Sequence, residues 1–438
     1  MKKKAAFYTL GCKVNFCETE SLKALLVKSG YRITDFEDEA DLYIINTCTV
    51  TGYSDHKSRK AIRRARRRSP EALLVVTGCY AQAEPEKVAE MEEVDLVIGT
   101  RDRTNLPELI SSIKGDEKGK NLVIPHDGKE RFELMPIMGK RGRTRGFIKI
   151  QEGCDQHCTY CIVPSVRGKP RSMPPEAVLD RAETLVRAGC KELVLTGIHL
   201  GLYGLDSADY DDLTLASLLR ELQKLPGLLR LRLSSLEPSD ITAELVDVVA
   251  HSSIICPHLH MPLQSGDGEI LRLMNRPYNA SEFLYLAKWL KQQVPGLSLS
   301  SDVIVGFPGE SERHHRRSLS LIKDIGFSRL HVFKYSLRPG TAAAKMPGQL
   351  PNAVKDKRSR EMIALGDKMA AQYRSQFIGT VHPVLVEKVE PYHFGEGFTP
   401  HYMRVRIKMD IKGRHWRNQI VRARIEGEEN GILTACKA

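Results

Sequence analysis

The chain has 438 residues, which is more than one ordinary core organises, so two or three domains are expected. It contains no apolar run of about eighteen residues that could cross a membrane. The apolar stretch after its charged N-terminus is too short for a signal peptide, so a cytoplasmic location is expected. In that reducing compartment the ten cysteines are expected to include metal ligands rather than a disulfide framework.

Positive charge is clustered along the chain. The net charge is +12, and KSRKAIRRARRR at 57–68 contains eight basic residues and no acidic one. A second basic run, GKRGRTRGFIK, covers 139–149. One such run is as often a solvated helix face, but two of them in a basic chain favour a polyanion partner such as nucleic acid.

The first domain is expected over 1–115 and alternates between strands and helices. Short apolar runs predict buried parallel strands at 5–12, 41–48, 73–79 and 96–100. Helical patterns between and after them, at 18–29, 55–68 and 84–92, complete a doubly wound α/β domain.

Three cysteines of this first domain, Cys12, Cys48 and Cys79, each stand at the carboxyl end of an expected strand. Parallel sheets bind ligands beyond those ends, so the three thiols are expected to converge as ligands. A single buried cysteine at such a place is usually a small apolar residue, which is the alternative.

A linker over 116–146 is expected to precede a second, longer α/β series over 147–375. Its strands are predicted at 147–153, 192–197, 229–238, 258–266, 297–309 and 329–337. Six strand–helix units predict a partial (βα)6 barrel with its chemistry at the carboxyl ends of the strands. Over 376–438, apolar and polar residues alternate around glycine-rich turns, which predicts a small antiparallel β-barrel.

Three further cysteines, Cys154, Cys158 and Cys161, lie within eight residues in EGCDQHCTYCIVPSVRG, after the first strand of the second series. Thiolates select soft metals or iron–sulfur clusters. A structural zinc site completed by His157 is the alternative, but the spacing is cramped and no second CxxC lies nearby. Three thiols on a cubane would leave one iron open, as a catalytic metal centre does for its substrate.

The loop CDQHCTYC resembles the CxxxCxxC loop of the radical S-adenosylmethionine enzymes. In that superfamily a 4Fe–4S cluster binds S-adenosylmethionine at its open iron, and one electron cleaves the cofactor to a 5′-deoxyadenosyl radical. TLGCKVNFCETE, NTCTVT and TGCYAQ, with RLSSLEP, HMPLQSGDGEILRLMNRPY and SDVIVGFPGE, are similar to the methylthiotransferases of this superfamily. The tail resembles a TRAM module, an RNA-binding β-barrel.

The resemblance to the methylthiotransferases implies that a C–H hydrogen is replaced by –SCH₃. It implies two 4Fe–4S clusters, a radical cluster on Cys154, Cys158 and Cys161 and a second one on Cys12, Cys48 and Cys79 that holds the sulfur. It further implies S-adenosylmethionine as methyl donor and radical source, and an electron donor such as flavodoxin or ferredoxin.

Among the branches of this family, NTCTVT and GEGFTPHYMRV look most like the one that modifies N6-threonylcarbamoyladenosine beside the anticodon of tRNA. Two other branches stay open: one modifies isopentenyladenosine in tRNA, and one modifies an aspartate of a ribosomal protein, which IVPSVRGKPRS resembles in part. An RNA-binding iron–sulfur protein without turnover is the non-enzyme alternative. The basic runs favour an RNA substrate, and two three-cysteine sets favour an enzyme.

Contacts to S-adenosylmethionine are predicted at strand ends and beside the last cysteine of the loop. Tyr160 resembles the aromatic residue that lies against the adenine, and a glycine at a strand end lets the backbone approach the amino group. The predicted cofactor-binding residues are Tyr160, Thr196, Gly197, Ser235, Glu237, Gln264, Ser265 and Asp302. Packing is the alternative for Tyr160 and for the serines.

RNA contacts are predicted on the basic helix and on strands of the tail, where arginines alternate and share a face. The predicted residues are Lys57, Arg59, Lys60, Arg63, Arg64, Arg66, Arg67, Arg68, Arg404, Arg406, Arg422 and Arg424. Tyr402 and Trp416 are expected either to stack on a base or to fill a small core. His314 and His315 are expected at the surface of a helix.

Overall fold

The computed structural model describes residues 2–113, 118–139, 144–206, 212–390, 394–408 and 416–438. The chain forms two compact units. The first unit contains Met1–Met138, Lys149–Met173 and Ser336–Ala344, and the second contains Gly139–Ile148, Pro174–Tyr335 and Lys345–Ala438. The sequence boundaries proposed at 115, 146 and 375 remain predictions.

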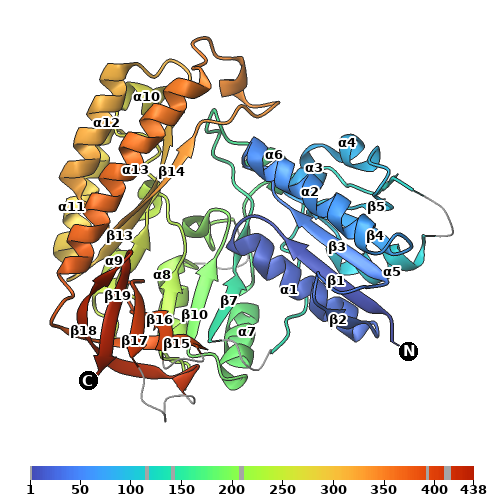
Figure 1. Cartoon of the computed structure of the whole chain (residues 1–438), viewed down its shortest axis with the longest axis horizontal. Helices are drawn as coiled ribbons and strands as arrows, with labels where there is room; N and C mark the ends of the chain where they lie inside the picture. Colours follow the sequence, from blue (N-terminus) through green and yellow to red (C-terminus); the bar gives the residue numbers. More distant parts are fainter. Residues whose placement is uncertain (1, 114–117, 140–143, 207–211, 391–393, 409–415) are drawn as a thin grey trace. The chain divides into compact units, whose positions relative to one another are not determined.

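The first unit is built on a parallel sheet of order β2-β1-β3-β4-β5-β6 (Figure 1). Its strands are β1 (Lys4–Thr9), β2 (Arg32–Thr34), β3 (Leu42–Thr47), β4 (Leu73–Gly78), β5 (Leu96–Val97) and β6 (Lys120–Asn121). Its helices are α1 (Lys13–Lys28), α2 (Gly52–Arg68), α3 (Cys79–Ala83), α4 (Pro85–Ala89), the 3₁₀ turn η1 (Arg103–Asn105), α5 (Leu106–Ser111) and α6 (Val163–Arg167). A short antiparallel pair, β8 (Gln151–Glu152) and β9 (Arg171–Ser172), flanks the CxxxCxxC loop.

Both faces of this sheet are buried, which confirms the doubly wound arrangement. Leu42 and Ile44 of β3 belong to one apolar core together with Leu22 of α1, and Tyr43 and Ile45 belong to another together with Ile62 of α2. Successive strand residues point to opposite faces, so an uninterrupted apolar strand supplies both cores.

The second unit contains six further strands. They are β7 (Arg145–Lys149), β10 (Glu192–Thr196), β11 (Arg230–Leu233), β12 (His258–His260), β13 (Ser298–Val305) and β14 (Arg329–Lys334). They form the sheets β11-β10-β7 and β12-β13-β14, which the parallel bridges Leu231–Ile255 and Ser235–His260 join. The resulting strand order is β7-β10-β11-β12-β13-β14. This order confirms the partial six-stranded barrel that the sequence predicted.

Helices and 3₁₀ turns connect the strands of this unit. They are α7 (Pro175–Arg187), η2 (Leu200–Leu202), α8 (Leu215–Leu222), η3 (Pro238–Asp240), α9 (Ala243–Ala250), α10 (Gly268–Leu273), α11 (Ala280–Gln293), α12 (Glu312–Ile325) and α13 (Asn352–Ser375). The 3₁₀ turn η4 (Ala342–Lys345) begins in the segment of the first unit that ends at Ala344. On α12, His315 is 1% exposed and bonds Glu361 of α13, so the expectation of a surface position is wrong for this residue. The ring of His315 is buried between α12 and α13 and bonds the two helices to each other.

The tail forms a closed barrel of order β15-β16-β17-β19-β18. Its strands are β15 (Val381–Glu390), β16 (Phe394–Phe398), β17 (Arg404–Lys408), β18 (Ile420–Glu429) and β19 (Ile432–Lys437). The sequence predicted an antiparallel barrel, but β17 and β19 pair in parallel, because β18 lies between β15 and β19 and completes the closure. Trp416 is 6% exposed within this core, which favours the packing role over base stacking.

Within the second unit, buried arginines attach the tail barrel to the six-stranded one. Arg230 donates to the Phe398 carbonyl at 2.9 Å, and Arg232 donates to the Pro400 carbonyl at 2.8 Å. The Arg232 guanidinium also lies 4.5 Å from the ring centroid of Tyr402. Among the described residues, no helix has the length and apolarity needed to cross a bilayer.

Candidate cluster and cofactor site

The three cysteines of the N-terminal sheet lie at the carboxyl ends of neighbouring strands. Cys12 precedes α1 directly after β1, Cys48 follows β3, and Cys79 is the first residue of α3 after β4. Gly11, at φ +105°, brings the loop of Cys12 against Cys48, since a Cβ on Gly11 would lie 3.1 Å from that of Cys48. The predicted convergence of these strand ends is therefore present in the structure.

The environment of Cys79 shows that the three thiols share one electrostatic site. Burial raises the pKa of the Cys79 thiol to about 12, the Arg167 guanidinium lowers it, and the neighbouring Cys48 and Cys12 raise it. Buried thiols of this kind become good ligands when a bound cation compensates the thiolate charge. Cys48 is buried like Cys79, and Cys12 is exposed. Three thiols at one sheet edge fit a soft-metal cluster.

The CxxxCxxC loop turns tightly between β8 and α6. The Cys154 N–H donates to the Gly168 carbonyl at 3.0 Å, and the Cys161 N–H donates to the Cys158 carbonyl at 3.0 Å. Backbone N–H groups also point at two of the sulfur atoms: Gln156 donates to Cys154 Sγ and Val163 to Cys161 Sγ, each at 3.4 Å. Donors aimed at sulfur stabilise thiolates, so this loop also fits an iron–sulfur cluster.

Tyr160 is half-buried beside the last cysteine of that loop. The preceding carbonyl, that of Thr159, accepts a hydrogen bond from the Ala343 N–H at 2.8 Å, which ties the loop to 336–344 within the first unit.

Several predicted cofactor-binding residues adjoin one another in the second unit. The Gln264 N–H donates to the Asp302 carbonyl at 2.9 Å. The backbones of Ser235 and His260 form a parallel β-bridge. Gln264 adopts φ +64°, an unusual backbone conformation for a residue with a side chain. Thr196, at the end of β10, is buried, and Gly197 follows it.

Ser265 and Glu237 already have protein partners. Ser265 is 1% exposed, its Oγ lies 3.3 Å from Ser318 Oγ, and it accepts the Asp267 N–H, so it shapes the turn before α10. Burial raises the pKa of the Glu237 carboxyl, against the opposing effect of its ion-pair partner Arg276.

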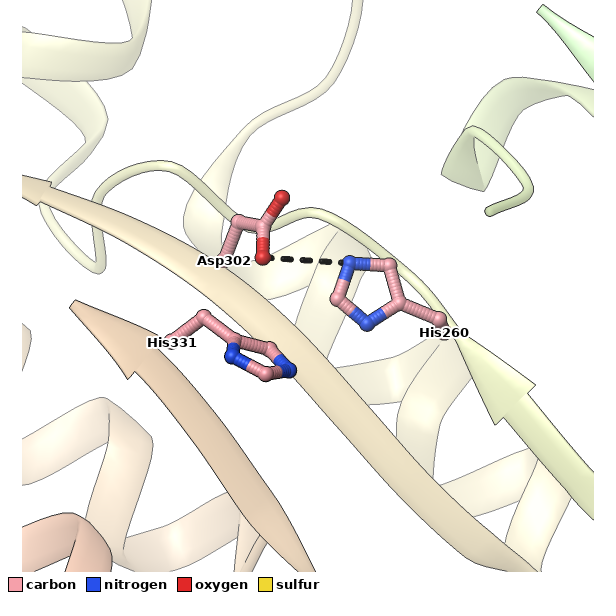
Figure 2. A group of neighbouring side chains, drawn as sticks. All are labelled: His260, Asp302 and His331. Carbon is pink, nitrogen blue, oxygen red and sulfur yellow. Dashed lines mark ion pairs between the residues drawn. The ribbon is translucent and has the colours of Figure 1, made fainter. Parts of the chain in front are cut away.

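Sequence reasoning missed two histidines beside Asp302 (Figure 2). His260 of β12 and His331 of β14 flank Asp302 of β13, and one ligand atom from each of the three lies within 4.8 Å of the others. His260 Nε2 lies 3.2 Å from Asp302 Oδ1, and its Nδ1 lies 3.0 Å from Ser300 Oγ. Because both ring nitrogens of His260 have protein partners, the group first of all orients the Asp302 carboxylate. The available signal was the alternation of polar and apolar residues along each of three neighbouring expected strands, which contain His260, Asp302 and His331.

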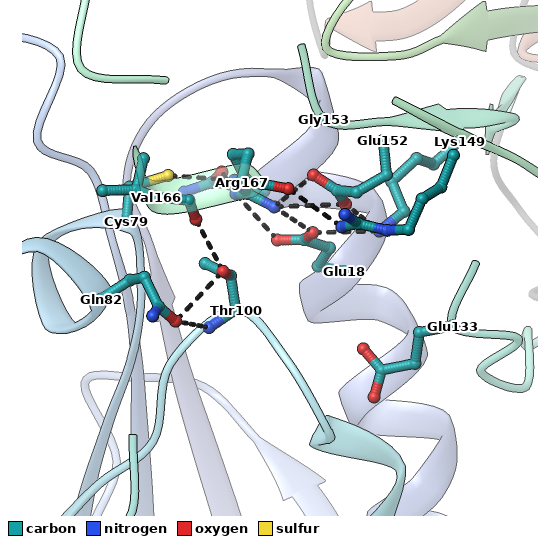
Figure 3. Close-up of polar contacts among 12 residues, drawn as sticks. Glu18, Cys79, Gln82, Thr100, Glu133, Lys149, Glu152, Gly153, Val166 and Arg167 are labelled. Atoms are coloured by element: carbon teal, nitrogen blue, oxygen red, sulfur yellow. Dashed lines mark hydrogen bonds and ion pairs between the residues drawn. The ribbon is translucent and has the colours of Figure 1, made fainter. Parts of the chain in front are cut away.

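A buried charge network is the second feature that sequence reasoning missed (Figure 3). Glu18 of α1 forms ion pairs with Arg103 at 2.8 Å, with Lys149 at 3.1 Å and with Arg167. Lys149 also pairs with Glu152 at 2.6 Å. Although burial opposes it, these cations hold the pKa of the Glu18 carboxyl well below 4.5. The network includes Arg167, which lies on the helix that follows the CxxxCxxC loop.

The basic helix α2 presents most of its predicted RNA-binding residues to solvent. Ala61, Ile62 and Ala65 are buried as expected. The exposed basic residues are Lys57, Lys60, Arg63, Arg64, Arg67 and Arg68. Arg64 and Arg68 pair with Glu37, and the half-buried Arg59 donates to the Tyr80 hydroxyl at 3.2 Å.

Arg66 of the same helix points inward. It bonds Asp95 at 2.6 Å and donates to the carbonyls of Glu93, Pro70 and Ala72. These bonds hold the C-terminal end of α2 against the start of β5, which is a structural role.

Arginines on the tail barrel alternate with core residues. On β18, Arg422 and Arg424 are exposed between the buried Val421, Ala423 and Ile425. On β17, Arg404 and Arg406 both pair with Glu396, which neutralises part of their charge.

Comparison with known proteins shows which class of proteins shares this fold. The Radical SAM superfamily profile matches residues 148–322, and the profile described as uncharacterized protein family UPF0004 matches 4–99. The structure resembles that of the radical S-adenosylmethionine methyltransferase TsrM from Kitasatospora setae, solved with cobalamin and a [4Fe-4S] cluster bound. The TM-score is 0.58 at 17% identity, over 78% of this chain and 77% of that one, which shows a shared fold. Fold and cysteine loop thus define a radical SAM protein.

Curated relatives narrow this class. The threonylcarbamoyladenosine tRNA methylthiotransferase MtaB of Bacillus subtilis is 43% identical and covers 95% of this chain and 94% of its own length. MtaB of Aquifex aeolicus is 39% identical, covering 84% of this chain and 89% of its own. The tRNA-2-methylthio-N(6)-dimethylallyladenosine synthase of Pelotomaculum thermopropionicum is 35% identical, covering 88% and 87%. The chain belongs to the MtaB family of tRNA methylthiotransferases, which confirms the resemblance identified in its motifs.

Proposed function

We propose that this protein replaces the C2 hydrogen of N6-threonylcarbamoyladenosine in tRNA by a methylthio group. The observation that carries the proposal is the presence of two three-cysteine sets, at the ends of β1, β3 and β4 and in the loop after β8. The names of the relatives support this base over the dimethylallyl base, because two relatives named MtaB are 43% and 39% identical to this chain. The relatives named as dimethylallyladenosine synthases are 34–36% identical. Because tRNA is the proposed substrate, the proposed site of action is the cytoplasm.

Cys154, Cys158 and Cys161 would hold the radical cluster, and Cys12, Cys48 and Cys79 the second cluster. When bound at the loop, a 4Fe–4S cluster supplies the electron that cleaves S-adenosylmethionine to a 5′-deoxyadenosyl radical. An external donor such as flavodoxin or ferredoxin would reduce it. The N–H groups of Gln156 and Val163 hold two of the loop's sulfur atoms in place.

The chain's part in binding S-adenosylmethionine falls to polar groups at strand ends. Ser235, Gln264 and Asp302 would bind its ribose and amino-acid portion, and His260 fixes the direction of the Asp302 carboxylate. Thr196 and Gly197 would contribute through the backbone, and Tyr160 through its ring.

The direct test is mass spectrometry of nucleosides from tRNA incubated anaerobically with the reconstituted protein, S-adenosylmethionine, a reductant and a sulfur source. We expect 2-methylthio-N6-threonylcarbamoyladenosine. Formation of 5′-deoxyadenosine without that nucleoside would leave the radical chemistry in place and contradict the proposed substrate. The methylthio derivative of isopentenyladenosine would then identify the second tRNA branch.

Removal of exposed charge from α2 is expected to weaken tRNA binding in a salt-dependent manner. Lys60, Arg63 and Arg67 are exposed and spaced to share a helix face, so each is proposed to contact a phosphate. Their joint replacement by alanine should reduce the slope of log affinity against log salt by roughly two to three. Filter binding of tRNA across a salt series measures this slope.

A matched control removes the same charge from another helix. Lys357, Arg360 and Lys368 are exposed on α13, and their joint replacement by alanine lowers the net charge equally. The slope should stay that of the parent protein. Equal losses in the two triple variants would refute a specific role for α2 and leave only the general charge of the chain.

A further inference from the structure

Arg167, which follows the CxxxCxxC loop in sequence, contacts Cys79 of the N-terminal set within the first unit (Figure 3). It is the last residue of α6, the helix that follows Cys154, Cys158 and Cys161 in sequence. Its Nε–H donates to the sulfur of Cys79, in the other set, at 3.2 Å. Arg167 is 1% exposed and Cys79 8%, so water does not compete for this contact.

The guanidinium is held on its other edges by three acceptors. It donates to Asn15 Oδ1 at 2.7 Å, to Glu152 at 3.2 Å and to Glu18. Asn15 in turn donates to the carbonyls of Leu10 and Thr47, at 2.8 and 2.9 Å. Leu10 stands two residues before Cys12, and Thr47 directly precedes Cys48. The direction of the arginine is therefore set by the same backbone that presents the cysteines.

A buried cation donating to a ligand sulfur changes the redox balance of a cluster. Reduction adds negative charge to the cluster, and a hydrogen bond from a cation to a ligand thiolate stabilises that charge. The stabilisation is larger in a dry site than at the surface, because the local dielectric response is weaker.

We propose that Arg167 is a positioning residue that raises the reduction potential of the cluster at Cys12, Cys48 and Cys79. The arginine is supplied by the helix that follows the radical SAM loop, so this segment adjusts the redox state of the cluster at the other cysteine set. The inference rests on the proposed assignment of these three cysteines to one cluster.

The test is a potentiometric titration followed by electron paramagnetic resonance. It uses the full chain with Cys154, Cys158 and Cys161 replaced by alanine, so that the signal of the reduced state comes from the N-terminal set alone. In this background R167M should lower the ratio of reduced to oxidised cluster at a fixed potential at least tenfold, a shift of about 59 mV. R167K keeps the charge without the fork of donors and should give a smaller decrease.

Arg103 supplies the matched control. It pairs with the same Glu18 and is equally buried, but its described bonds go to Glu18 and Glu133 rather than to a cysteine. R103M should change the ratio less than threefold. An unchanged ratio in R167M, or a change in R103M as large as that in R167M, would overturn the proposal.

A second variant tests whether the effect of R167M comes from a loss of folding caused by unbalanced buried charge. R167M/E152Q removes a cation and an anion together and keeps the charge balance of the network. A decrease in the same direction but smaller than in R167M is expected, because loss of the Glu152 anion favours the reduced cluster. A ratio equal to or above that of the parent in this variant also overturns the proposal. Iron and sulfide analysis of the protein without the loop cysteines tests the cluster assignment separately from the proposed effect of Arg167 on the reduction potential. If it holds no cluster while Arg167 is present, the assignment of Cys12, Cys48 and Cys79 is wrong, and the inference fails with it.

Discussion

Joint replacement of Cys154, Cys158 and Cys161 by alanine is expected to abolish both 5′-deoxyadenosine and the methylthio nucleoside. The loop then has no thiolate to hold a cluster, so S-adenosylmethionine has neither its electron source nor its iron ligand. Binding of tRNA should stay within about twofold of the parent, because the exposed residues predicted to contact RNA lie on α2, β17 and β18. Chromatography of the small-molecule products and filter binding measure the two effects.

Two sets of control variants sharpen this result. Cys12, Cys48 and Cys79 replaced by alanine should leave 5′-deoxyadenosine formation while the methylthio nucleoside disappears, because only the sulfur-holding set is lost. Alanine at Cys17, Cys190 and Cys436 should leave both products, since these thiols match no ligand pattern. Methylthiolation that persists without the loop cysteines would refute the radical SAM interpretation altogether.

The placement of the cysteines at strand ends and in one loop could be predicted from sequence because its signals are local. Cys12, Cys48 and Cys79 each follow an apolar run, and the carboxyl ends of parallel strands necessarily meet at one edge of a sheet. The spacing of Cys154, Cys158 and Cys161 is contained in one loop. The barrel strands of the second unit were found for the same reason, since each is a compact apolar segment.

The charge network could not be predicted, because it has no period. Glu18, Arg103, Lys149, Glu152 and Arg167 come from five separate elements or turns, and each alone reads as a surface residue. Only the tertiary fold shows that they share one dry site. The histidines beside Asp302 were missed for a related reason: the alternation of each strand is visible in sequence, but the register of β12, β13 and β14 is not.

The parallel pairing of β17 with β19 also could not be predicted from local sequence patterns. Alternation in the tail predicts strands and their buried faces, as Val421, Ala423 and Ile425 confirm. The order in which strands close a barrel depends on long-range pairing, and a short turn at Asn430 and Gly431 places β19 beside β18 before it reaches β17.

Replacement of Glu18 by alanine is expected to lower the free energy of unfolding by about 3–5 kcal/mol. The change leaves Arg103, Lys149 and Arg167 buried with fewer anions, and unpaired buried charge is costly. Urea unfolding of the iron-free chain, followed by circular dichroism, measures the loss. Glu20→Ala on the same helix removes a half-exposed pair with Lys23 and should cost less than about 1 kcal/mol.

The stabilising effect of Glu18 should itself depend on pH in a defined direction. Its pKa in the folded chain lies well below the ordinary 4.5, because Arg103, Arg167 and Lys149 outweigh the opposing effect of burial. The folded state therefore binds fewer protons than the unfolded state in the acid range, and stability falls as pH decreases. The contribution is fully present above about pH 4.5 and is lost as pH falls toward the folded-state pKa.

The difference in unfolding free energy between the parent chain and E18A should accordingly shrink as the pH is lowered from 6 to about 3. The iron-free chain is the appropriate sample, because acid releases iron from iron–sulfur clusters. The E20A chain should differ from the parent by less than about 1 kcal/mol at each of these pH values. A difference between parent and E18A that stays constant with pH would show that the loss comes from packing, and that the carboxylate of Glu18 does not balance the charge of Arg167 and its neighbours.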